Sequence, residues 1–170
     1  MQELYEICQA VIHIHDLPAF FSRIKAIARD AGVHIIFLDA DRMAGAAHVR
    51  AALSHALRAE RAGKMISRSV EMEVLLYAGG TRQVQNATTF GIHPGLNRSY
   101  VCIYPPSPGA LDALSGLLSW TNDDWEEISP GKASLLMEIF GITDRERAAA
   151  GKAPLSDLVI ERVALLDINR

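Results

Sequence analysis

Hydrophobic residues recur at every second position in some stretches of the chain and every three to four positions in others. The first pattern puts Ala10, Ile12 and Ile14 on one face of an extended segment, which predicts a strand. The second pattern is typical of helices that bury one side. Together the two patterns predict strands at 5–14, 33–38, 99–104 and, briefly, 125–128, and helices at 18–31, 44–62, 71–78, 81–92, 108–118, 130–140 and 157–166, with a short helix that begins at the capping box Thr143-Asp144-Arg145-Glu146.

These elements follow one another without an internal repeat, a low-complexity tract or a linker. We therefore predict a single domain over residues 1–170 with an α+β fold, in which a small mixed β-sheet packs with several helices. A content of 49% hydrophobic and 22% charged residues is typical of a chain that buries a core. No apolar run approaches the about 20 residues of a membrane span and no signal peptide is visible, so we expect a cytosolic protein without a membrane partner.

The segment 71–92, EMEVLLYAGGTRQVQNATTFGI, is the most informative part of the chain. Its first helix is apolar on nearly its whole circumference, which indicates a place in the interior of the fold. Gly79 and Gly80 are expected to end this helix, and Thr81 to cap the next one. Arg82 and Gln83 would then lie in the first turn of the second helix.

Two interpretations of Arg82 remain open at this point. In one, Arg82 pairs with Glu71 or Glu73 and braces the two helices against each other. In the other, Arg82 and Gln83 present hydrogen-bond donors to a phosphate or a base edge. The spacing of these residues is compatible with both.

Basic residues gather in the middle of the chain, although the net charge is −3. Residues 41–98 contain eight basic and four acidic side chains, and the counterweight is the acidic run at 123–127. One interpretation is a compact patch for nucleic acid, with aromatic side chains for base stacking. The alternative is a solvated helix end, whose cations suit the helix dipole. The basic candidates are Arg58, Arg61, Lys64, Arg68, Arg82 and Arg98, and the aromatic ones are Tyr77, Phe90 and Tyr100.

His13, His15 and Asp16 form the only arrangement that suggests a metal site, because alternate residues of a strand point the same way. A small metal-dependent hydrolase that uses these three residues is therefore the alternative function. Further metal ligands would have to come from elsewhere, and an exposed strand end explains the histidines equally well.

No motif for nucleophilic catalysis or phosphate binding is present, and Cys8 and Cys102 lie within predicted strands among apolar neighbours, as core thiols do. We therefore expect no catalytic residues, no bound metal and no cofactor in this chain. The functional expectation shifts to a protein that binds partners.

Four stretches of the sequence, in order along almost the whole chain, resemble the kinase-binding subunit family of the KEOPS (EKC) complex, whose human member is called the PRPK-binding protein. They are LDAD at 38–41, AGAAHVRAAL at 44–53, the segment 71–92 with its TRQ turn, and LVIERVALLD at 158–167. The compact length and the ERVALL ending are more similar to archaeal members. The sequence departs from the family at Ile36-Phe37, where relatives often have a glutamine.

The resemblance implies a non-catalytic subunit of a complex that installs threonylcarbamoyl on the tRNA adenosine beside the anticodon. Members of the family bind a kinase-like ATPase subunit, support its activity and help to recruit tRNA, in archaeal relatives through the single-stranded CCA end. The other subunits, a threonylcarbamoyltransferase and a dimerising protein, would be indirect partners.

We transfer the two binding roles to particular side chains of this sequence as hypotheses. For tRNA, the candidates are Arg61, Lys64, Arg68, Arg82 and Gln83. For the kinase-like subunit, the candidates are apolar positions expected to be exposed on the last helices, namely Leu136, Phe140, Ile142 and Leu158.

Overall fold

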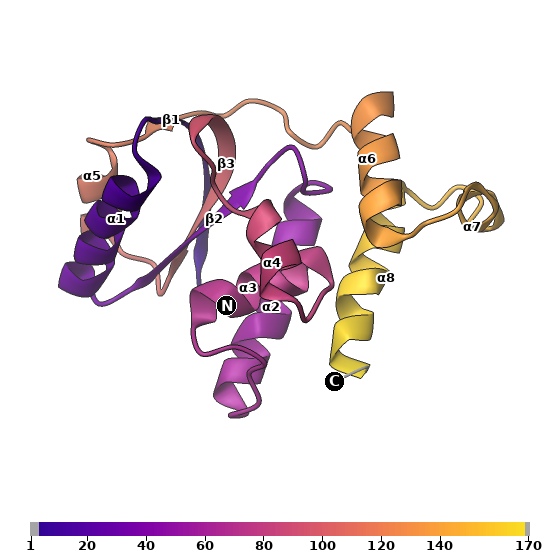
Figure 1. Ribbon diagram of the computed structural model, residues 1–170, viewed down its shortest axis with the longest axis horizontal. Helices are drawn as coiled ribbons and strands as arrows, with labels where there is room; N and C mark the ends of the chain where they lie inside the picture. The colour runs from indigo at the N-terminus through magenta and orange to yellow at the C-terminus, as the bar shows by residue number, and fades with distance from the viewer. Residues whose placement is uncertain (1–3, 169–170) are drawn as a thin grey trace. The chain divides into compact units, whose positions relative to one another are not determined.

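A computed structural model describes residues 4–168, which form two compact units (Figure 1). The first unit combines the N-terminal segment through Asp39 with Gly91–Asp123, and the second combines Ala40–Phe90 with the chain from Asp124 onward. Over the described residues there are four strands and eight α-helices. The α+β prediction is confirmed, and the single domain stays a prediction.

The first unit contains one sheet with the strand order β2-β3-β1-β4. Every pairing in it is antiparallel: β3 lies between β1 and β2 and runs opposite to both, and β4 runs opposite to β1. The predicted mixed sheet is therefore corrected to an antiparallel one. The strands are β1 (Glu6–Ile14), β2 (His34–Asp39), β3 (Gly95–Tyr104) and β4 (Ser119–Trp120).

Two helices, α1 (Leu17–Ala31) and α5 (Pro108–Leu114), cover one face of this sheet. The alternation seen in the sequence sends Ile12 and Ile14 of β1 to that face, where they join a buried cluster with Ile24 of α1. The strands that periodicity predicted at 5–14, 33–38 and 99–104 are confirmed within a few residues.

The second unit is helical, and α2 packs against both α3 and α8, while α6 packs against α8 (Figure 1). Most of α3 is buried, as its apolar circumference predicted. No helix in the described part of the chain is long and apolar enough to cross a membrane. The helices are α2 (Ala46–Arg61), α3 (Val70–Gly79), α4 (Val84–Ala87) with the 3-10 turn η1 (Thr88–Phe90), α6 (Pro130–Phe140), α7 (Asp144–Ala149) and α8 (Leu155–Ile168).

The strand predicted at 125–128 is wrong, because that segment has no regular structure and β4 forms earlier, where it pairs with β1. Trp125 is instead buried, and the Glu126 carboxylate accepts a hydrogen bond of 3.0 Å from the backbone N–H of Ala46. Glu126 thus caps α2, whose N-cap residue Gly45 has no side chain to do so. A side chain at Gly45 would collide with it, since an added Cβ would lie 2.4 Å from a Glu126 oxygen.

A fully buried histidine, His48, ties the first turn of α2 to the end of α3. Its Nδ1 accepts a hydrogen bond of 2.9 Å from the backbone N–H of Ala44, so its Nε2 carries the proton and donates 2.8 Å to the carbonyl of Ala78. Burial lowers the pKa of His48 to about 4, aided by the charge of Lys132 and opposed by the bond to Ala78. The imidazole is therefore neutral in the folded protein at neutral pH.

This arrangement predicts a loss of stability in mild acid. The folded state holds His48 neutral while the unfolded chain protonates it near pH 6.5, so stability falls as the pH decreases from about 6.5 towards 4. Between pH 7 and pH 5 we expect His48 to remove about 2 kcal/mol from the free energy of unfolding. Urea unfolding at the two pH values, with wild type and His48→Gln, measures this contribution.

The exposed histidine His15 supplies the matched control. His15→Gln should keep the full acid-dependent loss, whereas His48→Gln should lose about 2 kcal/mol less than wild type over the same interval. An equal loss in wild type and His48→Gln would contradict the assignment.

Candidate nucleic-acid interface

The side chains predicted to contact tRNA lie in two groups, at opposite ends of α3. Arg61, Lys64 and Arg68 come before the helix, whereas Arg82 and Gln83 come after it. With a rise of about 1.5 Å per residue, the ten residues of α3 separate the two groups by about 15 Å. A single compact patch that includes Arg82 is therefore wrong, and each group has its own surroundings.

The first group belongs to the end of α2 and to residues 62–69, which we call the basic loop. Lys64 and Arg68 are exposed, and neither side chain makes a hydrogen bond or ion pair within residues 4–168. Arg61 is also exposed, but its Nε donates 3.3 Å to the carbonyl of Leu57 in the preceding turn. Lys64 and Arg68 are thus the two cations of this group that have their full donor capacity available for an external anion.

The basic loop is anchored by Glu73, which the sequence suggested only as a partner for Arg82. Glu73 is fully buried, and its carboxylate accepts hydrogen bonds from the backbone N–H groups of Ile66 and Ser67 and from the Ser67 hydroxyl. The Arg82–Glu73 brace is therefore wrong, while the Arg82–Glu71 brace stays a prediction. The helical spacing of Glu73 with the buried Val70 was the signal that its carboxylate points inward.

At the other end of α3, two glycines shape the turn that carries the second group. Gly80 has φ of 57° and ends the helix, with Thr81 donating its backbone N–H 3.0 Å to the carbonyl of Leu76. Gly79 allows the ring of Phe90 to approach, since a Cβ there would lie 3.0 Å from a ring carbon. The predicted end of the helix is confirmed.

The predicted position of Arg82 and Gln83 in a helical first turn is wrong. Gln83 is the N-cap residue of the short helix α4, and Thr81 accepts a hydrogen bond of 3.1 Å from the Gln83 backbone N–H in a tight turn before it. Thr81 therefore shapes a turn that delays the helix by two residues. As a result Arg82 and Gln83 lie on an exposed turn.

A pocket of about 420 Å³ opens beside this turn. Its wall combines polar groups of the turn with apolar groups of two later helices, which is the usual composition of a small-molecule or nucleobase site. The residues that line it are Gly79, Gly80, Thr81, Arg82, Gln83, Ile139, Phe140, Arg162, Leu165 and Leu166.

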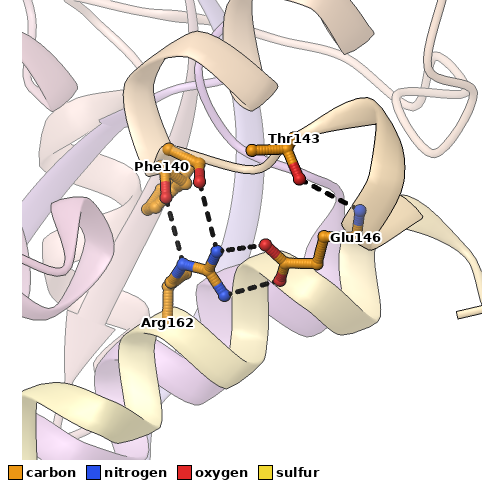
Figure 2. A network of polar contacts seen from close by, with 5 residues as sticks. Phe140, Thr143, Glu146 and Arg162 are labelled. Atoms are coloured by element: carbon orange, nitrogen blue, oxygen red, sulfur yellow. Dashed lines mark hydrogen bonds and ion pairs between the residues drawn. The ribbon is translucent and has the colours of Figure 1, made fainter. Parts of the chain in front are cut away.

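Arg162 fixes the α8 side of the pocket through a network shown in Figure 2. Its Nε donates 3.0 Å to the carbonyl of Phe140, and its two terminal nitrogens donate 2.8 and 2.6 Å to the two carboxylate oxygens of Glu146. These bonds from Arg162 lower the pKa of Glu146. The guanidinium is thus already engaged inside the chain, and Arg82 and Gln83 are the exposed polar side chains of the pocket rim.

Only one of the two hydrogen bonds of the predicted capping box at Thr143 is formed. The Thr143 hydroxyl accepts a hydrogen bond of 3.0 Å from the backbone N–H of Glu146, as expected (Figure 2). The carboxylate of Glu146 turns to Arg162 instead of completing the box. The helix α8 begins at Leu155, two residues before the start predicted from periodicity.

The expectation that the four kinase-contact candidates are exposed is wrong. Leu136, Phe140, Ile142 and Leu158 are all buried, since α6 packs its apolar side against its neighbours and the Phe140 ring lies against His48 and Phe90. An apolar residue on a helix fills the core by default, and the spacing alone did not separate inner from outer positions. Their contact with a kinase stays a prediction.

The aromatic side chains expected to stack on bases are also buried. Tyr77, Phe90 and Tyr100 are at most 2% exposed. Tyr77 stacks on His55 and donates its hydroxyl to Asp167, which holds the end of α8 against α2 and α3. These three rings therefore support the interior and present no face for a base.

In the first unit, the rings of His13 and His15 lie side by side with centroids 4.3 Å apart. Asp16 does not join them as a ligand, because its carboxylate accepts a hydrogen bond of 3.0 Å from the backbone N–H of Ala19 and caps α1. Within residues 4–168, no group of three or more His, Cys, Asp or Glu side chains is placed to hold a metal ion.

Comparison of the sequence with known proteins identifies its family. The "Regulatory protein Cgi121" of Methanocaldococcus jannaschii is 27% identical to this chain over 150 residues, which covers 88% of the chain and 94% of that protein. The model of the family described as "Kinase binding protein CGI-121" matches residues 18–167, which include both ends of α3 and the whole pocket wall. The chain therefore belongs to the kinase binding protein CGI-121 family.

Proposed function

We propose that this protein is a non-catalytic regulatory subunit of the KEOPS complex that binds the kinase-like ATPase subunit and recruits tRNA for threonylcarbamoyladenosine modification. Membership of a kinase-binding family and the name of the archaeal relative support the regulatory part. The cytosolic location expected from the sequence is consistent with this role.

The observation that supports tRNA binding is that the Lys64 and Arg68 side chains are exposed and have no hydrogen-bond or ion-pair partner within the described chain. The two residues lie four positions apart in an anchored loop. Such cations suit the phosphates of a nucleic acid, because each contact releases condensed counterions. Arg61 in the last turn of α2 extends the same surface.

The pocket beyond the other end of α3 suits a single-stranded end. Its volume of about 420 Å³ can admit one nucleotide, and Arg82 and Gln83 on its rim offer donors for a base edge or a phosphate. We assign the 3' CCA end of the tRNA to this pocket and the preceding phosphates to the basic loop. About 15 Å between the two groups corresponds to a few nucleotides of extended single strand, so one tRNA end can reach both.

For the kinase-like subunit we retain the α6–α8 pair as the docking region, through exposed residues of these helices. Glu138 on α6 and Glu161 on α8 are exposed, whereas the apolar candidates Leu136, Phe140, Ile142 and Leu158 are buried. The proposed kinase contact on α6 and α8 then lies more than 60 residues after the basic loop along the chain.

The basic loop predicts a salt-dependent loss of tRNA affinity when its cations are removed. Lys64→Ala with Arg68→Ala should weaken binding of intact tRNA about tenfold at low salt and reduce the slope of log K against log salt by about 1 to 2. Filter binding or fluorescence anisotropy over a salt series measures both quantities. Binding of the kinase-like subunit should be unchanged.

The matched control is Arg23→Ala with Lys25→Ala on α1, which removes the same charges from exposed positions of the other unit. This variant should lose at most about twofold in affinity. Equal losses in the two double variants would point to net charge alone and contradict a site at the basic loop.

The pocket predicts discrimination between intact tRNA and tRNA without its CCA end. Wild type should bind the intact form more tightly, and Arg82→Ala should reduce this difference about tenfold while its unfolding midpoint remains unchanged. The Lys64→Ala, Arg68→Ala protein should weaken both ligands and preserve their ratio. A lower unfolding midpoint for Arg82→Ala, with unaltered discrimination, would instead support the structural brace.

A further inference from the structure

Glu73 is buried and does not line the pocket, yet its hydrogen bonds are directed to the loop that carries Lys64 and Arg68. We propose that Glu73 is a positioning residue for Arg68: it fixes the basic loop so that the Arg68 guanidinium is held ready for a phosphate. This inference rests on the proposed tRNA-binding function and concerns a buried residue that does not itself touch the tRNA.

The cradle around the Glu73 carboxylate uses both of its oxygens. One oxygen accepts 2.9 Å from the backbone N–H of Ile66, and the other accepts 2.8 Å from the backbone N–H and 2.7 Å from the hydroxyl of Ser67. Successive backbone N–H groups that converge on one anion hold a loop in a single conformation. Because the carboxylate is 0% exposed, water does not replace these bonds unless the loop opens.

Arg68 lies between two residues whose backbone is fixed. On one side, the Ser67 backbone N–H and hydroxyl both donate to Glu73, and the hydroxyl oxygen also lies 3.0 Å from the carbonyl oxygen of Ser69. On the other side, Ser69 caps α3 by accepting 3.1 Å from the backbone N–H of Met72. The backbone of Arg68 is thereby restricted on both sides, while its side chain remains exposed and without a partner in the described chain.

Lys64 is held by different bonds. Its backbone N–H donates 2.9 Å to the carbonyl of Ala59, and the preceding Gly63, with φ of 66°, donates 3.0 Å to the carbonyl of Glu60. These bonds close the end of α2 and do not involve Glu73. The loop therefore contains two cations, of which only one depends on the buried carboxylate.

The effect of losing Glu73 follows from this difference. Without the carboxylate, Ile66 and Ser67 lose their acceptor and the second half of the loop samples many conformations. Binding a phosphate would then require Arg68 to be ordered at that moment, which weakens affinity. The contribution of Lys64 would be retained.

The test is a set of double-mutant cycles on the full chain, read as affinity for intact tRNA. Glu73→Gln should weaken binding about threefold to tenfold alone and in a Lys64→Ala background, but should have no further effect in an Arg68→Ala background. Equal effects in both backgrounds would overturn the proposal, as would the absence of any effect of Glu73→Gln.

Glu127→Gln, at an exposed position of the same unit, is the matched control for charge. Each substitution removes one negative charge, which by itself favours tRNA binding, so weaker binding by Glu73→Gln alone cannot come from net charge. Ser67→Ala, which removes one of the three donors and keeps the carboxylate, should give a smaller loss that also requires Arg68, and it serves the cycle if Glu73→Gln fails to fold.

Hydrogen exchange separates failure of this inference from failure of the proposed function. Glu73→Gln replaces one of the two acceptor oxygens with an NH2 donor, so it should accelerate exchange of the Ile66 amide, the Ser67 amide or both, and leave that of Lys64 unchanged. Wild-type exchange rates at both Ile66 and Ser67 would overturn the anchoring. If Arg68→Ala binds tRNA as wild type does, the phosphate contact of the proposed function fails, and the positioning role falls with it. If Arg68→Ala weakens binding and Glu73→Gln does not, the positioning role alone is wrong.

Discussion

The burial of α3 is the constraint on which the rest of the second unit depends. A helix that is apolar on nearly all sides must be enclosed, and α2, α4, η1 and α8 pack around it. The few polar groups within it then need partners from inside the protein, because water does not reach them. Glu73 takes its partners from the preceding loop, and Tyr77 takes Asp167 from α8.

Both candidate binding groups follow from how this helix begins and ends. At its start, the buried carboxylate organises a loop that carries Lys64 and Arg68 into solvent. At its end, Gly79 and Gly80 let the chain turn tightly against Phe90 and α8, which leaves Arg82 at the rim of a pocket. Because α3 itself is buried, the exposed polar residues of the two candidate groups lie beyond its two ends, about 15 Å apart.

Much of the fold could be predicted from the sequence, because periodicity reports burial directly. Periodicity correctly predicted the strands β1, β2 and β3, the long helices and the enclosed α3, whereas the helix predicted at 81–92 is only the four-residue α4 and the 3-10 turn η1. The errors lie where a residue's role depends on a partner outside its own helix or strand: β4 exists because it pairs with β1, and Glu73 binds the loop before α3 instead of Arg82. For the same reason the sequence identified Arg82 and Gln83 but not the pocket beside them, whose other wall comes from residues 139–166.

The same limit explains why Leu136 and Leu158 were taken for surface residues. Hydrophobic burial has no direction, so a helix such as α8, with apolar residues on several sides, can be rotated about its axis at little loss of buried area. Directional contacts remove that freedom: Arg162 binds the end of α6 and Glu146, and Asp167 binds Tyr77 and His55. In the rotation of α8 that these polar contacts hold, Leu165 and Leu166 line the pocket.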